Sequence, residues 1–292
     1  MQIQSFKVFC DVADARSFTK AAQLNSVTQS AVSQTLTSLE NHFKSLLVER
    51  SKKNFRLTAE GEVVYDYGKR LLQSYEAIQH TMQELKDIIS GDIRVATVYS
   101  IGLHDLPPYL KKFLQTYPTV NVHVEYRRAN QVYEDIIGNV VDLGLVAYPH
   151  PHPKVQIVPL RRDPLVLICH PDHPFAKRTM VKLKMLEGQK FISFEPDMPT
   201  RKALDKILRA KGVKVQHAME FDNIETVKQA VSLDSGVAIV PAETIKLEVA
   251  NRFVAAVKLE GRYYRQLGAI YRKNKVLSPA MKQFLVLLKE TM

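Results

Sequence analysis

Apolar residues in the first part of the chain recur at helical spacing and predict short helices joined by a tight turn. Ser17 can cap a helix through Ala21 and Ala22, whose small side chains let a second helix pack closely. After a turn at residues 25–27, Thr28 can cap a longer helix. The positions expected to face inward on that helix are Ala31, Val32, Leu36 and Leu39.

The outward face of the longer helix is polar. Its residues are Thr28, Gln29, Ser30, Ser33, Gln34 and Thr35. Glutamine can pair bidentately with adenine in the major groove, while serine and threonine reach bases or phosphates. A basic loop follows, with Arg50 suited to a narrow minor groove and with further phosphate-neutralising cations at Lys52, Lys53 and Arg56. The pattern favours a helix-turn-helix with a basic wing that binds double-stranded DNA, although any three-helix domain also offers caps and a solvated polar face.

A third helix is predicted from Thr58 to Gly91, and its apolar residues alternate spacings of four and three. These residues are Leu71, Tyr75, Ile78, Met82, Leu85 and Ile89. The stripe is narrow and its flanks are polar, which favours pairing with a second copy of the chain over packing on its own domain.

From residue 93 the chain alternates apolar runs with amphipathic stretches, a pattern typical of a parallel sheet with helices. The first series, over residues 93–148, reads β-α-β-α-β. A second series covers residues 165–241, and a strand at 263–272 with a helix at 278–289 can return to the first lobe. We therefore expect two α/β lobes joined by crossing strands, with a cleft between them.

The formal net charge of +11 favours polyanionic partners, and its larger part lies beyond residue 91. An anionic effector or an auxiliary DNA contact explains this excess, as do scattered solvated lysines. A length of 292 residues with 46% hydrophobic content fits two or three domains. Cys10 and Cys169 are far apart, so we expect no structural disulfide and a reducing compartment. Without a secretion signal or an apolar run of membrane length, the sequence predicts a soluble cytoplasmic protein with no membrane contact.

Other candidate chemistry is weaker. Soft-metal ligands would be available at Cys169, His150, His152, His170 and His173, but proline-punctuated turns explain these histidines better, so we expect no metal and no cofactor. We find no phosphate-binding loop, nucleophile elbow, paired-carboxylate motif or CxxC pair, and predict that the chain is no enzyme. Two other classes of protein were considered. A solute-binding protein would carry an export signal and lack a helix-turn-helix, and the sequence meets neither expectation. A small-molecule enzyme would show turnover of candidate metabolites.

The first segment resembles the DNA-binding domain of LysR-type transcriptional regulators. The family pattern is matched at Ser17-Phe18, Ala21-Ala22, Val27 to Ser33, Leu39-Glu40, and Leu57-Thr58 with Gly61. Three departures are Asn25 where a leucine is usual, Lys44 for a common glycine and Val48 for a common phenylalanine. The resemblance continues, in weaker features, through His173-Pro174 and Gly236 to Pro241.

The resemblance implies an α/β multidomain chain. Its parts would be a winged helix-turn-helix at 1–58, a dimerising linker helix at 59–91 and a periplasmic-binding-protein-like effector domain at 92–292. Within that domain, lobe 1 would span about 92–161 and 266–292, and lobe 2 about 162–265. Such chains form homodimers and homotetramers on promoter DNA, where a small-molecule effector alters DNA bending and contact with RNA polymerase.

The resemblance also places the effector between the lobes. The residues it brings there are Thr97, Ser100, Ile101, Asn130, Ala147, Ser193, Thr200 and Arg201. Hydroxyls beside a helix N-terminus suit an anion, and Arg201 could clamp a carboxylate. Alternatively, any of these residues can be a turn or cap residue, and Arg201 can face solvent.

Overall fold

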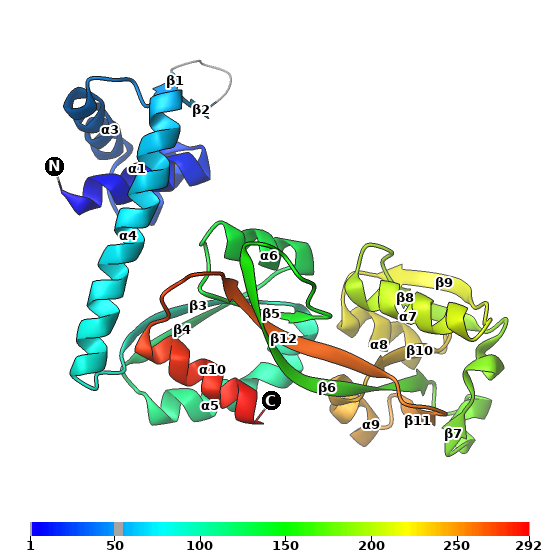
Figure 1. Ribbon diagram of the computed structural model, residues 1–292. Coiled ribbons are helices and arrows are strands. Elements are labelled where there is room, and N and C mark those ends of the chain that lie inside the picture. The colour runs from blue at the N-terminus through cyan, green and yellow to red at the C-terminus, as the bar shows by residue number, and fades with distance from the viewer. Residues whose placement is uncertain (1, 50–54, 292) are drawn as a thin grey trace. The chain divides into compact units, whose positions relative to one another are not determined.

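The computed structural model describes residues 2–49 and 55–291 (Figure 1). The chain divides into two compact units, one made of residues 1–88 with 275–279 and the other of 89–274 with 280–292. Among the described helices, none is long and apolar enough to cross a membrane.

The first unit is the predicted helix-turn-helix with a short two-stranded wing. Its elements are α1 (Ile3–Ala15), α2 (Phe18–Leu24), α3 (Gln29–Phe43), β1 (Val48–Glu49) and β2 (Arg56–Leu57). The core between the helices contains Phe9, Val12, Ala21, Val32 and Leu39, all at most 1% exposed. The hydroxyl of Ser17 accepts the Lys20 N–H, and that of Thr28 accepts the Ala31 N–H, so both predicted caps are present.

The departures from the family pattern have local explanations. Asn25 ties the turn to α1, because its Nδ2 donates to Asp11 at 2.8 Å and its Oδ1 accepts from Lys7 Nζ at 2.8 Å. Lys44 ends α3 with a left-handed φ of 52°, a conformation that glycine adopts without strain. Val48 is buried and packs in the core with Leu47.

Helix α4 (Ala59–Leu85) begins where Thr58 Oγ1 accepts the Gly61 N–H at 2.9 Å. A Cβ on Gly61 would lie 2.0 Å from the Leu47 carbonyl oxygen, so only glycine fits this close approach. The helix ends at Leu85, and Asp87 then adopts a left-handed φ of 50°. The predicted end at Gly91 is therefore wrong, and Ile89 lies outside the helix.

The first lobe of the second unit has the predicted β-α-β-α-β succession. Its parallel strands, in the order β4-β3-β5, are β4 (Val120–Tyr126), β3 (Gly91–Thr97) and β5 (Leu143–Ala147). Its helices are α5 (Leu106–Thr116), α6 (Ala129–Ile137) and the returning α10 (Pro279–Thr291). Helix α6 covers one face of the sheet, while α5 and α10 pack together on the other through Phe113 and Phe284 (Figure 1).

Two long antiparallel strands connect the lobes, β6 (Val155–Cys169) and β12 (Tyr264–Arg272). In the second lobe β6 also pairs with β10 (Ala238–Pro241) and β11 (Ala255–Leu259), and β11 pairs with β7 (Met180–Val181). A separate parallel pair is β8 (Lys190–Phe194) with β9 (Gln216–Phe221). The remaining helices are α7 (Pro199–Ala210), α8 (Ile224–Ser232) and α9 (Lys246–Ala250), with 3-10 turns at Pro174–Lys177, Leu183–Leu186 and Ala242–Ile245.

A π-helical turn, η1 (Ile101–Asp105), separates β3 from α5 and was not predicted. The turn packs tightly, since a Cβ on Gly102 would lie 2.6 Å from side-chain atoms of Thr97 and Tyr126. Its last residue, Asp105, is only 2% exposed. This π-helical turn therefore buries a carboxylate next to the loop of residues 97–101, which was expected to bind the effector.

Candidate functional site

The polar face of α3 is open to solvent in the first unit. Gln29, Ser30, Ser33 and Gln34 are exposed, as are Thr37 and Ser38, which the prediction left out although helical spacing continues the face through them. Thr28 is exposed, but its oxygen caps α3.

Thr35 departs from its predicted outward position. The residue is half-buried, and its hydroxyl donates to the Ala31 carbonyl oxygen at 2.9 Å. Because that hydroxyl bonds its own helix, Thr35 offers less to a base than its exposed neighbours do. At the wing, Arg56 is exposed, whereas Arg50, Lys52 and Lys53 fall in the segment that the structure does not describe.

Helix α4 carries a stripe of exposed apolar side chains. The predicted members on the helix are Leu71, Tyr75, Ile78, Met82 and Leu85, and all of them are exposed. Val63 and Tyr67 extend the same stripe toward the N-terminus at spacings of four, which the prediction did not use. Contiguous exposed apolar surface of this kind is typical of an interface.

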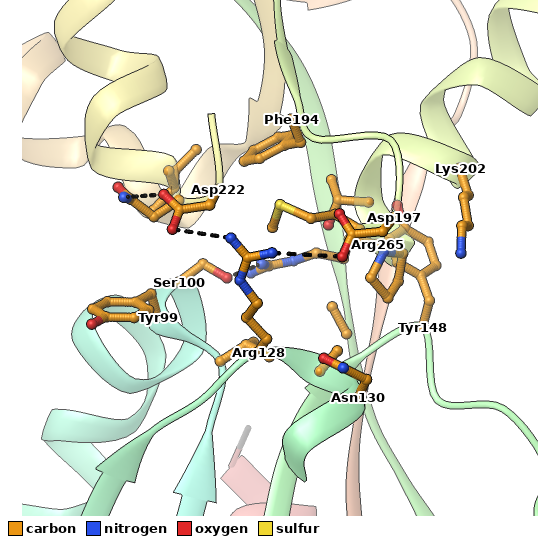
Figure 2. Close-up of a pocket in the computed structure, with 18 of the residues that line it drawn as sticks. Tyr99, Ser100, Arg128, Asn130, Tyr148, Phe194, Asp197, Lys202, Asp222 and Arg265 are labelled. Carbon is orange, nitrogen blue, oxygen red and sulfur yellow. Dashed lines mark hydrogen bonds and ion pairs between the residues drawn. The ribbon is translucent and has the colours of Figure 1, made fainter. Parts of the chain in front are cut away.

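A cavity of about 450 Å³ lies between the two lobes of the second unit (Figure 2). Tyr99, Ser100 and Asn130 line it from the first lobe, and Phe194 and Thr200 from the second. Both its size and its mixture of apolar walls with a few polar groups suit a small organic molecule.

The structure brings only part of the predicted effector set to this cavity. Ser100, Asn130, Ala147 and Thr200 line it. Thr97 does not, because it is buried in β3 with its hydroxyl donating to the Val98 carbonyl oxygen. Ile101 is also buried, at the start of the π-helical turn, where its side chain belongs to the core.

Arg201 is the main correction to the predicted site. Its Nε donates to Asp205 at 2.9 Å, and its Nη1 donates to Glu220 at 2.6 Å and to the Phe194 carbonyl oxygen at 2.9 Å. The guanidinium is thus occupied inside lobe 2 and does not line the cavity. Ser193 is likewise buried, with its Oγ 2.5 Å from His217 Nδ1.

A buried ionic cluster lies behind the cavity, and the sequence did not reveal it. Arg265 of β12 is 1% exposed, and its Nη1 donates to Ser100 Oγ at 2.7 Å. Its Nη2 lies 2.6 Å from Asp163 and 3.3 Å from Asp105, and Arg161 contacts the same two carboxylates. Burial, with the nearby charge of Asp163, raises the pKa of Asp105 to about 6.

Arg128 joins the two lobes at the rim of the cavity. From the N-terminus of α6 it reaches Glu195 of lobe 2 at 3.0 Å. It also reaches Asp197 at 3.6 Å and Asp222 at 3.4 Å, both in lobe 2 (Figure 2). These carboxylates raise the pKa of the Arg128 guanidinium. Within the described residues, the adjacent Arg127 forms its ion pairs inside lobe 1, with Glu125 and with Asp135 at 3.3 Å.

The histidines considered as metal ligands have other partners. The His150 ring stacks on Tyr133 with centroids 4.1 Å apart, and His173 Nδ1 accepts the Phe175 N–H at 3.1 Å. In the described part of the chain, no three His, Cys, Asp or Glu side chains are grouped to hold a metal ion.

Both units match family models of known proteins. Residues 3–62 match the model described as "Bacterial regulatory helix-turn-helix protein, lysR family", and residues 86–292 match "LysR substrate binding domain". The chain belongs to the LysR family of transcriptional regulators. As a LysR-type protein it is a DNA-binding regulator with an effector domain and not an enzyme.

Individual LysR-type relatives match over nearly the whole chain. The RuBisCO operon transcriptional regulator of Allochromatium vinosum is 30% identical, with 97% of this chain and 94% of the relative covered. The transcriptional activator CmpR of Synechocystis is 29% identical, with 97% and 93% covered. A full-length OxyR variant from Pseudomonas aeruginosa has the same fold, with a TM-score of 0.80 at 19% identity over 99% of this chain and 98% of OxyR.

Proposed function

We propose that this regulator recognises promoter DNA through the exposed polar face of α3, with Gln29, Ser30, Ser33 and Gln34 as base or phosphate contacts. The proposal is supported by the exposure of these side chains on the second helix of a helix-turn-helix, the element that enters the major groove in such domains. Arg50, Lys52 and Lys53 are proposed as phosphate or minor-groove contacts from their charge and position in the sequence. Thr28 would support DNA binding mainly by capping α3. Thr35 would contribute least to DNA contact, because its hydroxyl donates to the Ala31 carbonyl oxygen.

The effector is proposed to bind in the interlobe cavity, in contact with Ser100, Asn130, Ala147 and Thr200. The observation that carries this proposal is the cavity itself, since polar groups from both lobes line it. A ligand that contacts both lobes binds one cleft arrangement better than another, and this difference in affinity biases the conformation.

The exposed stripe on α4 is proposed as the dimer interface, because apolar side chains along one face of a helix gain free energy when a second copy covers them. The two DNA-binding domains of a dimer would bind a two-fold DNA site, and dimers would assemble into tetramers. Effector binding would then change the spacing of the DNA-binding domains, the DNA bend and the contact with RNA polymerase. Residues 1–58, 59–91 and 92–292 are the proposed functional divisions, with the helical part of the linker ending at Leu85.

Footprinting on the DNA upstream of the protein's own coding region, across a salt series with nonspecific competitor DNA, tests the proposed function. A protected two-fold site that resists competitor is the expected result. Because five relatives are named for RuBisCO gene regulation, promoters of such genes form a second set of probes. Diffuse protection at every locus, lost at modest salt, would show only nonspecific attraction and would overturn the proposal.

A further inference from the structure

Exposed cations gather at the end of lobe 2 that lies away from the interlobe cavity. Strand β8 runs from Lys190 to Phe194, and Phe194 lines the cavity, so Lys190 marks the opposite end. Strand β9 is parallel to β8 with Gln216 opposite Lys190, so the turn from α7 into β9 lies at the same end (Figure 1). The cations there are Lys184, Lys190, Arg209, Lys211 and Lys214, all of them exposed, and we call them the lobe 2 basic patch.

Hydrogen bonds between separate segments hold this patch together. Lys184 Nζ donates to the Gly212 carbonyl oxygen at 3.2 Å, and the Gly188 N–H donates to the Lys214 carbonyl oxygen at 2.9 Å. Gly212 has a left-handed φ of 63°, and its N–H donates to the Arg209 carbonyl oxygen at 3.0 Å. The fold therefore brings cations from three segments of lobe 2 to one surface.

The patch carries more positive charge than negative. Glu187 is the one carboxylate in residues 184–190 and 206–214, and it pairs with Lys184 at 3.3 Å. Among the residues that the structure describes, Lys190, Arg209 and Lys211 form no ion pair. A helix C-terminus favours nearby cations, which accounts for Arg209 and Lys211 but not for Lys190 at the start of β8. The unbalanced charge is thus available to an anionic partner.

The composition of the patch favours double-stranded DNA as that partner. Residues 184–190 and 206–214 contain no aromatic residue on which unpaired bases could stack. The same residues expose no large apolar side chain, the kind that anchors a protein interface. Lysine and arginine suit the phosphates of a duplex. Because the first unit of the same chain binds DNA, the duplex is held at high effective concentration for the patch.

We propose that the lobe 2 basic patch is a second, sequence-independent contact to the duplex that the helix-turn-helix binds. This inference rests on the proposed recognition of promoter DNA and adds a phosphate contact from the effector unit. It assigns part of the positive charge beyond residue 91, for which the sequence alone left several explanations open. Because the patch is on lobe 2, an effector that changes the lobe arrangement would also change this contact.

Lysine acetylation of the full chain, with and without a random-sequence duplex of about 60 base pairs, tests the patch. Bound phosphates cover an ammonium group, so Lys190 and Lys211 should react at least about threefold more slowly with DNA present. Lys111 and Lys112 are the matched controls, as exposed lysines on α5 of lobe 1, and DNA should leave their rates unchanged. Protection of Lys190 and Lys211 at rising protein concentration without DNA would assign the surface to a contact between copies and overturn the inference.

The salt dependence of binding to the same duplex gives a second test. Lys190→Gln combined with Lys211→Gln should lower the slope of log K against log salt by about two, because each lost phosphate contact removes about one. Lys111→Gln combined with Lys112→Gln removes the same charge from lobe 1 and should leave the slope unchanged. Equal slopes for wild type and the patch variant would show that the patch does not contact DNA. Circular dichroism of both double variants verifies folding.

Failure of the proposed function gives a different result. Absence of a protected two-fold site in the wild-type footprint would reject promoter recognition. A protected site combined with unprotected Lys190 and Lys211 would reject this inference alone.

Discussion

Gln29, at the start of α3, is one of two exposed glutamines on that helix whose amide can read a base directly. Its amide can donate to and accept from one adenine, so Gln29→Ala should lose about 1–3 kcal/mol of preference at a single base position. A binding competition against operators substituted one base pair at a time would measure this change.

Gln23 provides the matched control for Gln29, as an exposed glutamine on the preceding helix. Gln23→Ala should leave the order of operator preference unchanged, because the first helix of the motif crosses the backbone. If Gln29→Ala weakened all operators equally, Gln29 would be a phosphate contact instead of a base reader.

The two cysteines should be chemically inert in the folded chain. Burial raises the pKa of Cys10 to about 12 and that of Cys169 to about 11. Since the thiolate is the reactive form and a raised pKa lowers its fraction, at pH 8 that fraction falls to about 0.1% or less. Iodoacetamide labelling should therefore be at least about 100-fold slower than for the chain unfolded in guanidinium, and a fast reaction of either folded thiol at pH 8 would contradict this expectation.

At the scale of elements, helix α4 packs on α1 within its own unit and also carries the exposed apolar stripe proposed to pair with a second copy. Gly61 and Gly68 allow its first turns to pack against Leu47 and α1, whereas Ile78 and Leu85 remain exposed farther along. The heptad spacing predicted the stripe, but it did not predict the helix end, which depends on the left-handed turn at Asp87.

Ile78→Asp should weaken the proposed dimer by at least about tenfold, because a carboxylate would be desolvated in an apolar seam. Sedimentation velocity across a concentration series measures the change. Gln79→Asp introduces the same charge at the adjacent exposed position and should leave association unchanged. An unaltered dimer in Ile78→Asp would place the interface elsewhere.

At the scale of the effector unit, two polar contacts at the cavity rim link the lobes, in addition to the crossing strands and the buried cluster of Arg265, Asp105 and Asp163. Arg128 reaches three lobe 2 carboxylates, and His104 lies 2.7 Å from Glu225 of α8. Contacts of this kind at a partly exposed rim are individually weak. They can therefore yield to an effector without unfolding either lobe.

Arg128→Ala should let the lobes separate more often, raising hydrogen exchange of the segments around 195–198 and 222–223 about two- to fivefold. Arg127→Ala is the matched control, because the ion pairs of Arg127 stay within lobe 1. Exchange in these lobe 2 segments should not change in the control. Equal exchange in both variants would show that Arg128 does not hold the lobes together.

The sequence by itself determined the elements whose causes are local. Caps at Ser17 and Thr28, the apolar period of α3 and the alternation in residues 93–148 depend on neighbours within a few positions, and such short-range patterns predicted the helix-turn-helix and the first lobe. Of the predicted effector residues, the structure brings Ser100, Asn130, Ala147 and Thr200 to one cavity.

Only the tertiary structure decided which charged and hydroxyl groups face that cavity. Arg201 was predicted there but is occupied by Asp205 and Glu220, while Arg265 and Tyr148 line it without any recognisable local signal. Arg265 meets Asp105 and Ser100 from positions 160 and 165 residues away. The burial and pairing of a charge depend on such distant partners, which no pattern of adjacent residues specifies.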